Sequence, residues 1–457
     1  MNGKIIEIDI TDLAFDGKAV GHLDGKVIFL NGGLPGERVR AEIVRSKPRY
    51  YNGIVHEIMK RCDKRIEAVC EHFSICGGCS WQDLDYNEQL KYKKHQTVDC
   101  LARLGHITDV EVADVIGSGE KFFYRNKMEF SFHVTTDESF TLGLHQRGHY
   151  DKIFDLRQCH LESQLSNKLV DWIRNWVTRE SIPVYDVKQH TGYMRFLVIR
   201  EGKRTSQTMV NIVTNYGDFP NAEELVRQMT HDFPAVVTII HNQNDKRSNI
   251  AVGEIESILH GPGYIEELLC DKTFRIRANS FFQTNPVQAE TLYRTAFEML
   301  QPDPGDRVLD LYCGTGSISI LLAGQVSEVL GVELVSDAIR AARENAELNG
   351  ITNTNFIEAN VAEFLKAPPT NLADFHVVII DPPRAGLHPK ALKRLLSLQP
   401  EKLLYISCNP STFARDARRI IDSGYQLPKV QPVDMFPHTM HIELVGLFSL
   451  TEDSCPA

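Results

Sequence analysis

Short apolar runs alternate with amphipathic stretches from about residue 275 onward, and this alternation constrains the fold more than any other feature. Five of the apolar runs have the length of buried strands. They lie at 307–312, 328–332, 376–380, 403–407 and 442–450. Residues 337–349 predict a helix that Ser336 caps and Gly350 ends. Strands that alternate with helices predict an α/β fold with a doubly wound, mostly parallel sheet, whose ligands bind at the carboxyl ends of the strands.

The chain of 457 residues is too long for one ordinary core, so two or three domains are expected. Residues 1–60 contain short predicted strands separated by glycine turns, which favours a small OB-like β-barrel of the kind that binds oligonucleotides. These strands lie at 4–10, 25–30, 38–44 and 53–58. Residues 61–274 predict a central α/β domain with a cysteine cluster. Residues 275–457 form the catalytic domain, and part of 88–120 is expected to pack on it.

Charge is distributed unevenly along the chain. The formal net charge of −10 disfavours a nucleic-acid partner when it is taken alone. Residues 37–65 nevertheless hold nine Lys and Arg against four Asp and Glu, a local net charge of +5. Within this segment, residues 45–51 interleave cations with aromatic side chains that can pair with phosphates and stack on bases. The alternative interpretation is a solvated basic loop.

The bulk composition excludes several classes of protein. With 42% hydrophobic and 24% charged residues, the chain has the composition of a globular protein. No apolar stretch approaches the roughly 18–20 residues that span a bilayer, so a cytoplasmic location and no membrane partner are expected. Ten cysteines in such a compartment favour metal ligation or catalysis over disulfides.

Residues 308–317 predict a buried strand, a glycine turn and a helix, which together form a nucleotide-type ligand loop. Gly314 and Gly316 let a ligand approach the backbone. A nicotinamide dinucleotide fold would require a third glycine, which is absent at 317–319. Glu333 ends the next predicted strand and can bind both hydroxyls of a ribose. The loop therefore favours S-adenosylmethionine over a nicotinamide cofactor.

Three further polar residues lie in or directly after predicted strands. Asp381 precedes two prolines that stiffen the backbone and hold its carboxylate at the mouth of the cofactor pocket. Cys408 ends an apolar run at an Asn-Pro break, and Glu443 is a carboxylate in an otherwise apolar strand. A lone buried cysteine is usually inert, and a lone glutamate there usually lies on an exposed edge.

Together, a thiol, a methyl donor and a carboxylate meet the requirements for methylating C5 of uracil. A thiolate that adds to C6 makes C5 nucleophilic, and a base must later remove the C5 proton. Arg384 occupies the place where enzymes that methylate exocyclic amines carry an aromatic residue, and this disfavours that alternative. RNA cytosine-C5 methylases carry a cysteine in the Asp381 motif, and this chain has none there.

Several motifs resemble the RNA uracil-5-methyltransferase family, in particular its 23S rRNA branch. The matching segments are 280–285, 310–316, 381–386, 407–410 and 441–443, while 16–21 and 33–39 resemble the TRAM domain, a small RNA-binding barrel. The resemblance implies a Rossmann-like S-adenosylmethionine-dependent methyltransferase domain. It also implies Cys408 as the nucleophile and Glu443 as the base. The family's cofactor-pocket positions align with Gln283, Tyr312, Ser317, Glu333, Asn360 and Asp381. Gln283 could instead bind the flipped base.

The cysteine cluster consists of Cys70, Cys76 and Cys79, with Cys159 as the fourth candidate ligand. Four thiolates can hold either a zinc ion or a 4Fe–4S cluster, and the spacing does not match the paired C-x2-C of a zinc ribbon. The resemblance favours the 4Fe–4S cluster, because the 23S rRNA branch carries this spacing. Because methyl transfer needs no electron, we expect a structural or RNA-positioning role.

The sequence thus predicts a monomeric enzyme that transfers a one-carbon group, forming 5-methyluridine in 23S rRNA. One alternative is a tRNA uracil-C5 methyltransferase, although the tRNA enzymes of the family are expected to be shorter and to lack the barrel and cluster. Another is a non-catalytic RNA-binding or assembly factor. Such a factor would be expected to have lost Cys408 or Glu443, and both are present.

Overall fold

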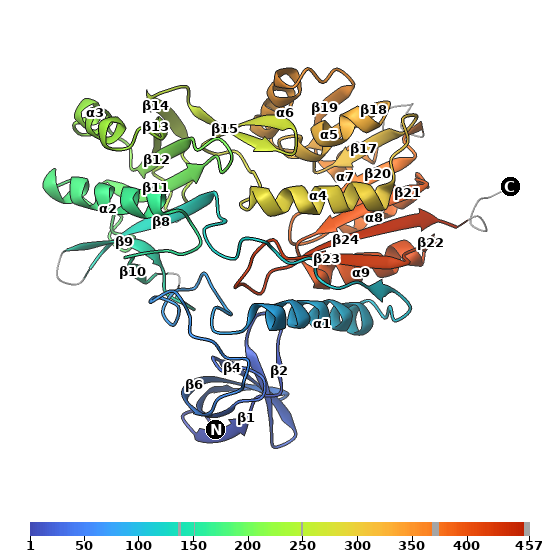
Figure 1. Cartoon of the computed structure of the whole chain (residues 1–457), viewed down its shortest axis with the longest axis horizontal. Coiled ribbons are helices and arrows are strands. Elements are labelled where there is room, and N and C mark those ends of the chain that lie inside the picture. The colour runs from blue at the N-terminus through green and yellow to red at the C-terminus, as the bar shows by residue number, and fades with distance from the viewer. Residues whose placement is uncertain (136–138, 150, 248–249, 368–373, 452–457) are drawn as a thin grey trace.

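The computed structural model describes residues 1–135, 139–149, 151–247, 250–367 and 374–451. Figure 1 shows three parts: an N-terminal barrel at the bottom, a central α/β part on the left and a C-terminal α/β part on the right. Among the described residues, no helix is long and apolar enough to cross a membrane.

The N-terminal part is a six-stranded sheet that curls on itself, with strand order β1-β5-β6-β4-β3-β2. Its strands are β1 (Ile5–Asp9), β2 (Asp12–Leu13), β3 (Ala19–Leu23), β4 (Lys26–Asn31), β5 (Arg38–Ser46) and β6 (Tyr50–Lys60). Alternate residues of β1 and β5 are buried, as a sheet with one solvated face requires. A Cβ at Gly53 would stand 2.6 Å from the Glu42 carbonyl oxygen, so only glycine allows β5 and β6 to approach this closely.

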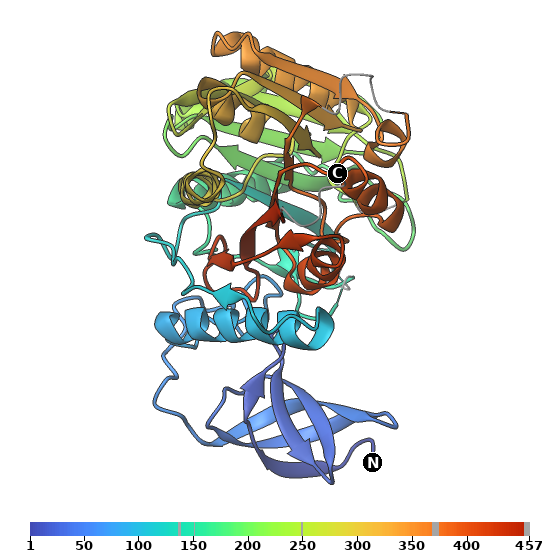
Figure 2. The same cartoon turned by 90° about the vertical axis from the view of Figure 1, so that its right-hand side faces the viewer.

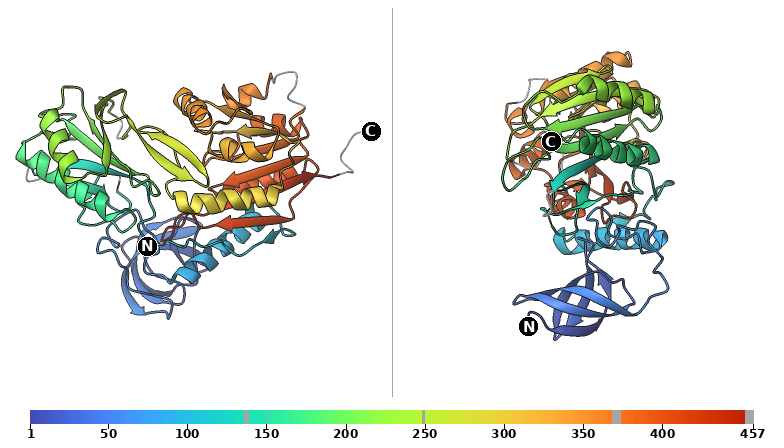
Figure 3. Two further views of the ribbon diagram at one scale, coloured as in Figure 1. Left: turned by 45° about the horizontal axis from the view of Figure 1, so that its top comes forward. Right: turned by 90° about the vertical axis from the view of Figure 1, so that its left-hand side faces the viewer.

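The central part is built on a seven-stranded sheet with order β10-β9-β8-β11-β12-β13-β14. Its elements are β8 (Lys127–Val134), β9 (Phe140–His145), β10 (Ile153–Asp155), α2 (Gln164–Arg179), β11 (Met194–Glu201), β12 (Thr208–Thr214), α3 (Ala222–Asp232), β13 (Val236–Gln243) and β14 (Ile255–His260). The hairpin of β15 (Tyr264–Leu269) and β16 (Lys272–Arg277) follows. Figure 3 shows this hairpin between the central and C-terminal parts.

The C-terminal part contains a nine-stranded sheet with the path β19-β18-β17-β20-β21-β24-β23-β7, and β22 pairs with β24. Its strands are β17 (Arg307–Leu311), β18 (Glu328–Glu333), β19 (Thr354–Glu358), β20 (Val377–Ile380), β21 (Lys402–Ser407), β22 (Tyr425–Gln426), β23 (Lys429–Val433) and β24 (Glu443–Leu450). Its helices are α4 (Pro286–Leu300), α5 (Ser317–Leu322), α6 (Ser336–Leu348), α7 (Val361–Phe364), α8 (Pro389–Leu396) and α9 (Pro410–Ile421), with the 3-10 turn η1 (Ala323–Gln325).

This arrangement confirms the predicted α/β fold with a doubly wound sheet. The strands from β19 through β21 are parallel, whereas β24 runs antiparallel between β21 and β23. The predicted cap at Ser336 is wrong. Ser336 is the first residue of α6 and its hydroxyl donates to Glu358, while Val335 occupies the cap position without a side-chain bond.

Residues far upstream of the C-terminal part join it. Helix α1 (Tyr86–Leu104) lies along α9, as Figures 1 and 2 show. Strand β7 (Glu111–Val112) then pairs in parallel with β23 at the edge of the sheet. The chain therefore leaves the barrel, lines the C-terminal part and only afterwards forms the central sheet.

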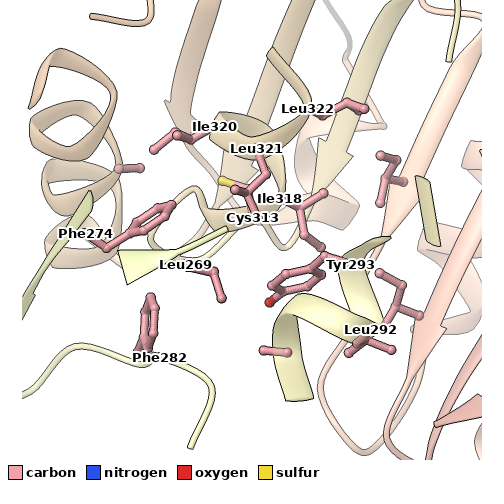
Figure 4. Packing of buried hydrophobic residues seen from close by; sticks show 14 of the residues in the cluster. Leu269, Phe274, Phe282, Leu292, Tyr293, Cys313, Ile318, Ile320, Leu321 and Leu322 are labelled. Atoms are coloured by element: carbon pink, nitrogen blue, oxygen red, sulfur yellow. The ribbon is translucent and has the colours of Figure 1, made fainter. Parts of the chain in front are cut away.

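The hydrophobic core connects the hairpin, α4 and α5 directly beneath the ligand loop. Phe274 of β16 and Phe282 pack with tilted rings at 5.8 Å between ring centroids, and Figure 4 shows them close to Leu269 and Tyr293. Ile318 of α5 packs in the same cluster. This packing fixes the segment around residue 283 against the strand ends of the sheet.

Candidate active site

A cavity of about 1300 Å³ opens at the carboxyl ends of β17, β18, β20 and β21. All eight residues predicted for catalysis and cofactor binding line it. They are Gln283, Tyr312, Ser317, Glu333, Asn360, Asp381, Cys408 and Glu443. This is the edge where a doubly wound sheet binds its ligands. The structure therefore brings together side chains that are up to 160 residues apart in the sequence.

The ligand loop is held in a constrained conformation between β17 and α5. Tyr312 has a positive φ of 66°, and its backbone N–H donates to the Val332 carbonyl at 2.9 Å. Gly316 also has a positive φ, and a Cβ there would meet the Ala342 side chain of α6 at 3.0 Å. The turn therefore places α5 tightly against α6, with Ser317 as the first helical residue lining the cavity.

Glu333 is oriented by backbone donors at the end of β18. Its Oε1 accepts the Leu334 and Val335 N–H groups at 2.7 and 2.9 Å, and its Oε2 accepts that of Gly314 at 3.3 Å. Asn360 caps α7 at the end of β19, and its side-chain oxygen accepts the Ala362 N–H at 2.9 Å. A fixed carboxylate and a fixed amide are suited to binding the hydroxyl and amine groups of a nucleoside.

Two carboxyls lie near the loop, Asp310 beneath it and Asp381 in the cavity wall. Asp310 is fully buried, its Oδ2 accepts the Ser319 hydroxyl at 2.5 Å, and its Oδ1 has no hydrogen-bond partner in the described chain. Burial raises the pKa of Asp310 to about 6. Burial, reinforced by Asp310, raises that of Asp381 to about 7. Asp381 lines the cavity and Asp310 does not, so the ligand loop separates the Asp310 side chain from the cavity.

Cys408 follows the last residue of β21 and precedes Asn409, the N-cap of α9. The Asn409 amide donates to the Arg384 carbonyl at 3.0 Å, which ties the thiol-bearing turn to the Asp381–Gly386 loop. Burial raises the pKa of the Cys408 thiol to about 11. The Glu443 and Asp381 carboxylates act in the same direction, whereas the Arg384 cation favours the thiolate.

Glu443 is the first residue of β24, which lies between β21 and β23, so it is not on an exposed edge. Its side chain is buried and lines the same cavity as Cys408. Burial and the neighbouring Asp381 raise the pKa of Glu443 well above its usual range, and Arg384 opposes them. A desolvated carboxylate of this kind is a stronger base when it is ionised.

Gln283 contacts Tyr293 of α4 through a side-chain hydrogen bond. The central part also holds this segment, because the Asn126 side chain donates to the Gln283 carbonyl at 3.1 Å and its backbone N–H to Thr284 at 2.8 Å. Arg200, which is fully buried, donates to the Ser280 carbonyl at 2.7 Å. The central domain therefore contributes to the site, although the sequence suggested only a cysteine cluster in that domain.

Most other cavity residues were missed by the sequence reasoning. Basic side chains line the cavity, among them Arg125, Arg384, His388, Lys390 and Arg394. Such a lining suits a polyanionic substrate. Phe436, Thr439 and His441 also line it, from the segment before Glu443. Arg384 and His441 had a signal, because they belong to the 381–386 and 441–443 motifs, whereas the others come from segments with no local motif.

A second cavity, of about 280 Å³, is lined by all four predicted ligand cysteines, Cys70, Cys76, Cys79 and Cys159. The Gly78 N–H donates to the Cys76 sulfur and the Gln82 amide to the Cys79 sulfur, both at 3.3 Å. Within the described residues, no three His, Cys, Asp or Glu side chains are grouped closely enough for a single metal ion. Gly78 and Arg125 line both cavities, so the two share a wall.

Known proteins with related sequences share both the barrel and the catalytic part. A family profile described as tRNA (Uracil-5-)-methyltransferase matches residues 85–451, and a TRAM domain profile matches residues 1–55. The chain belongs to the tRNA (uracil-5-)-methyltransferase family. It is therefore an RNA methyltransferase, with S-adenosylmethionine as its methyl donor and an N-terminal TRAM domain.

Relatives of this methyltransferase match it over nearly the whole length. An uncharacterized RNA methyltransferase of Chlorobaculum tepidum is 39% identical, covering 98% of this chain and 97% of its own. One from Caldanaerobacter subterraneus subsp. tengcongensis is 38% identical, covering 97% and 98%.

Among solved structures, the Pyrococcus abyssi tRNA (uracil-54, C5)-methyltransferase in complex with S-adenosyl-L-homocysteine is 31% identical with a TM-score of 0.77. It covers 97% of this chain and 100% of its own. The expectation that tRNA enzymes lack the N-terminal regions therefore does not hold for this enzyme. The first 160 residues consequently do not decide which RNA is the substrate.

Proposed function

We propose that the methyltransferase forms 5-methyluridine by methylating C5 of a uracil in 23S rRNA. The C5 chemistry is supported by the observation that Cys408 and Glu443 line one cavity together with the S-adenosylmethionine-type loop. The choice of 23S rRNA rests on the cysteine spacing that resembles the 23S rRNA branch. Neither a thiol nor a buried carboxylate is needed for methylation of an amine, whereas C5 chemistry requires both.

In this mechanism Cys408 is the nucleophile. Its thiolate forms a bond to C6 of a uracil that has left its stack, and the ring charge moves onto C5 and O4. Arg384 supports this step because its cation favours the thiolate that burial and Glu443 disfavour. When bound, S-adenosylmethionine would supply an electrophilic methyl group to C5, with S-adenosylhomocysteine as the leaving group.

Glu443 completes the reaction as the base. The methylated adduct carries a surplus hydrogen at C5, and the Glu443 carboxylate removes it as a proton. The released electron pair re-forms the C5–C6 double bond while the C6–sulfur bond breaks and the Cys408 thiolate leaves. The Glu443 side chain is buried in the wall of the cavity, which raises its affinity for this proton.

The residues present suit the methyl donor. The oriented Glu333 carboxylate can accept the ribose hydroxyls, and Asn360 and Ser317 provide polar groups around the nucleoside. Asp381 and Tyr312 complete the cofactor pocket. Gln283 is assigned to this pocket too, with the flipped uracil as the alternative partner, because it lines the cavity beside Tyr293.

We assign a 4Fe–4S cluster to Cys70, Cys76, Cys79 and Cys159. Four thiols line one cavity, and two of their sulfurs accept N–H bonds, as cluster ligands commonly do. A cubane cluster binds each thiolate on a separate iron, so its ligands stand farther apart than those of a zinc ion. The cluster would order the 70–79 loop and supply no electron to methyl transfer.

A tRNA substrate is the second candidate, because a tRNA-directed enzyme matches this chain from end to end. Mapping of 5-methyluridine in rRNA and tRNA from a deletion strain would distinguish the two. Loss of the modification from 23S rRNA alone is expected. Its loss from tRNA alone would replace the proposed substrate and leave the chemistry intact.

RNA that contains 5-fluorouracil tests the chemistry. Fluorine at C5 cannot leave as a proton, so the reaction should stop at a covalent enzyme–RNA adduct that survives denaturing electrophoresis. The adduct should require both S-adenosylmethionine and Cys408. If the wild-type enzyme forms no adduct with the 5-fluorouracil form of the RNA that it methylates, the mechanism is wrong.

A further inference from the structure

One buried ion pair connects the N-terminal half of the chain to the catalytic segment. The Lys93 ammonium of α1 lies 2.6 Å from the Asp434 carboxylate, and both side chains are completely inaccessible to solvent. Charged groups are almost never fully buried unless they are paired, because desolvation of each costs several kcal/mol. Neither residue lines the catalytic cavity, so the reaction as described does not use them.

Further hydrogen bonds satisfy the polar atoms of Lys93 and Asp434, and they fix the backbone at Phe436. Asp434 Oδ2 accepts the Tyr86 hydroxyl at 2.8 Å, and Oδ1 accepts the Phe436 N–H at 3.1 Å. Lys93 also donates to the Phe436 carbonyl at 3.2 Å. Both polar groups of the Phe436 backbone are therefore bound by the ion pair.

Phe436 belongs to the segment 434–443, which runs from the end of β23 to Glu443. Three of its residues before Glu443 also line the catalytic cavity, namely Phe436, Thr439 and His441. The ion pair thus anchors the start of the segment that carries the proposed base at its other end.

Other N-terminal elements hold the middle of this segment. Gln89 of α1 accepts the His438 N–H at 3.0 Å, and the Ser80 and Trp81 N–H groups both donate to the His438 carbonyl. Met440 packs against the barrel core. Helix α1, the end of the cysteine loop and the barrel therefore converge on residues 436–440.

We propose that Lys93 is a positioning residue for proton removal, acting through Asp434 on the segment that ends in Glu443. This inference rests on the proposed function of Glu443. An apolar pair could fill the same space, but it could not hold the Phe436 N–H and carbonyl together. Displacement of a catalytic group by about 1 Å can slow a reaction about a hundredfold.

The test compares Lys93→Met/Asp434→Leu with the wild-type enzyme. Because both charges are removed, no unpaired ion is left buried, and such replacements are often tolerated. The double variant should melt near the wild-type temperature and bind S-adenosyl-L-homocysteine normally. It should also form the covalent adduct when it is given an unmodified transcript of the RNA that the wild type methylates. Resolution of its methylated adduct should be about tenfold or more slower.

Two control variants distinguish a positioning role of Lys93 from a contribution to the stability of the whole protein. A purely structural role would reduce the active fraction without changing the resolution rate of the remaining enzyme. Arg307→Met/Glu328→Gln removes a partly buried pair, at 2.8 Å and at the amino ends of β17 and β18, opposite the cavity, and should not slow resolution. Tyr86→Phe removes one bond to Asp434 without touching a charge, and should slow resolution less than the double variant.

The outcomes distinguish this inference from the proposed function. If the wild type forms no adduct with 5-fluorouracil RNA, both fail. If the wild type forms the adduct but the folded double variant resolves its methylated adduct at the wild-type rate, the role of Lys93 alone is overturned. If the double variant does not fold, a wild-type resolution rate in Tyr86→Phe overturns that role.

Discussion

The two cavities share the wall formed by Gly78 and Arg125, yet they surround their thiols in opposite ways. In the larger cavity, the thiol of Cys408 is set among the Glu443 and Asp381 carboxyls and the Arg384 cation. In the smaller cavity, four thiols gather together, and two of them accept N–H bonds. Charged neighbours that can exchange protons suit a reactive thiol, whereas N–H donors suit a thiolate that stays bound to metal.

The two sites also differ in how the fold supports them. Cys408 directly follows β21, a strand buried between β20 and β24, and its position follows from the sheet. The 70–79 segment contains no helix or strand and is held partly by Arg147, whose guanidinium donates to the carbonyls of Phe73 and Cys79. We therefore expect the first site to survive loss of its thiol and the second to depend on its ligands for order.

The largest expected effect is that of Cys408→Ala. Without a nucleophile at C6, methylation should fall by more than about 10³-fold and the adduct with 5-fluorouracil RNA should disappear. Iron content and melting temperature should stay at the wild-type values, because the thiol is not a ligand. Methyl transfer assays with mass spectrometry of the RNA measure the first result. Methylation that persists at a tenth of the normal rate would exclude Cys408 as the nucleophile.

Glu443→Gln should slow turnover by about 10²- to 10⁴-fold, the usual contribution of a positioned base. The variant should still add Cys408 to C6 and accept the methyl group, because those steps precede proton removal. A covalent species that carries RNA plus one methyl group should accumulate on denaturing gels. If turnover slows without this species, Glu443 acts before methyl transfer and is not the base.

Cys79→Ser tests the smaller cavity and should have a moderate effect. Anaerobically purified wild type should contain about four irons per chain, and the variant should lose most of them. Disorder of the 70–79 loop should lower the melting temperature by about 5 °C or more and weaken RNA binding, while adduct formation continues at saturating RNA. Cys62→Ser is the matched control, because Cys62 lies outside this cavity. Stoichiometric zinc without iron in the wild type would reverse the cluster assignment.

The sequence allowed much of the catalytic part to be predicted, because parallel strands place their carboxyl ends on one edge. Asp381, Cys408 and Glu333 each end or follow an apolar run, so their common location followed from the strand pattern. The strand β3 was missed because it is short and contains Gly21. The Ser336 cap was wrong because Glu358, from the next strand, competes for that hydroxyl.

Contacts between distant segments could not be predicted from local patterns. Lys93 and Asp434 are separated by 341 positions, and each is an ordinary polar residue in its own surroundings. Tyr293 lies on a helix whose pattern indicates only a buried face. The hydrogen bonds from Asn126 to the 283–284 backbone likewise depend on how the central sheet docks. The roles of these residues depend on how the parts of the chain pack together, which local sequence patterns do not specify.

The smallest expected effect concerns the acidity of Cys408 and distinguishes the two kinds of thiol most directly. Only a thiolate reacts with iodoacetamide, and burial with two acidic neighbours raises the pKa of Cys408 to about 11. Its alkylation, followed by mass spectrometry of the peptide that contains it, should therefore keep accelerating between about pH 8 and 10, where an ordinary thiol of pKa about 8.5 levels off.

Glu443→Gln should alkylate several-fold faster at about pH 8, because removal of an acidic neighbour increases the thiolate fraction. Arg384→Met should alkylate more slowly, because it removes the cation that favours the thiolate. Cys79 and Cys159 of the iron-loaded protein should stay unmodified across the same range, since metal ligation occupies their sulfurs. Equal reactivity of Cys408 and Cys79 would mean that both cavities hold their thiols in the same state, and the contrast between the two sites would then be lost.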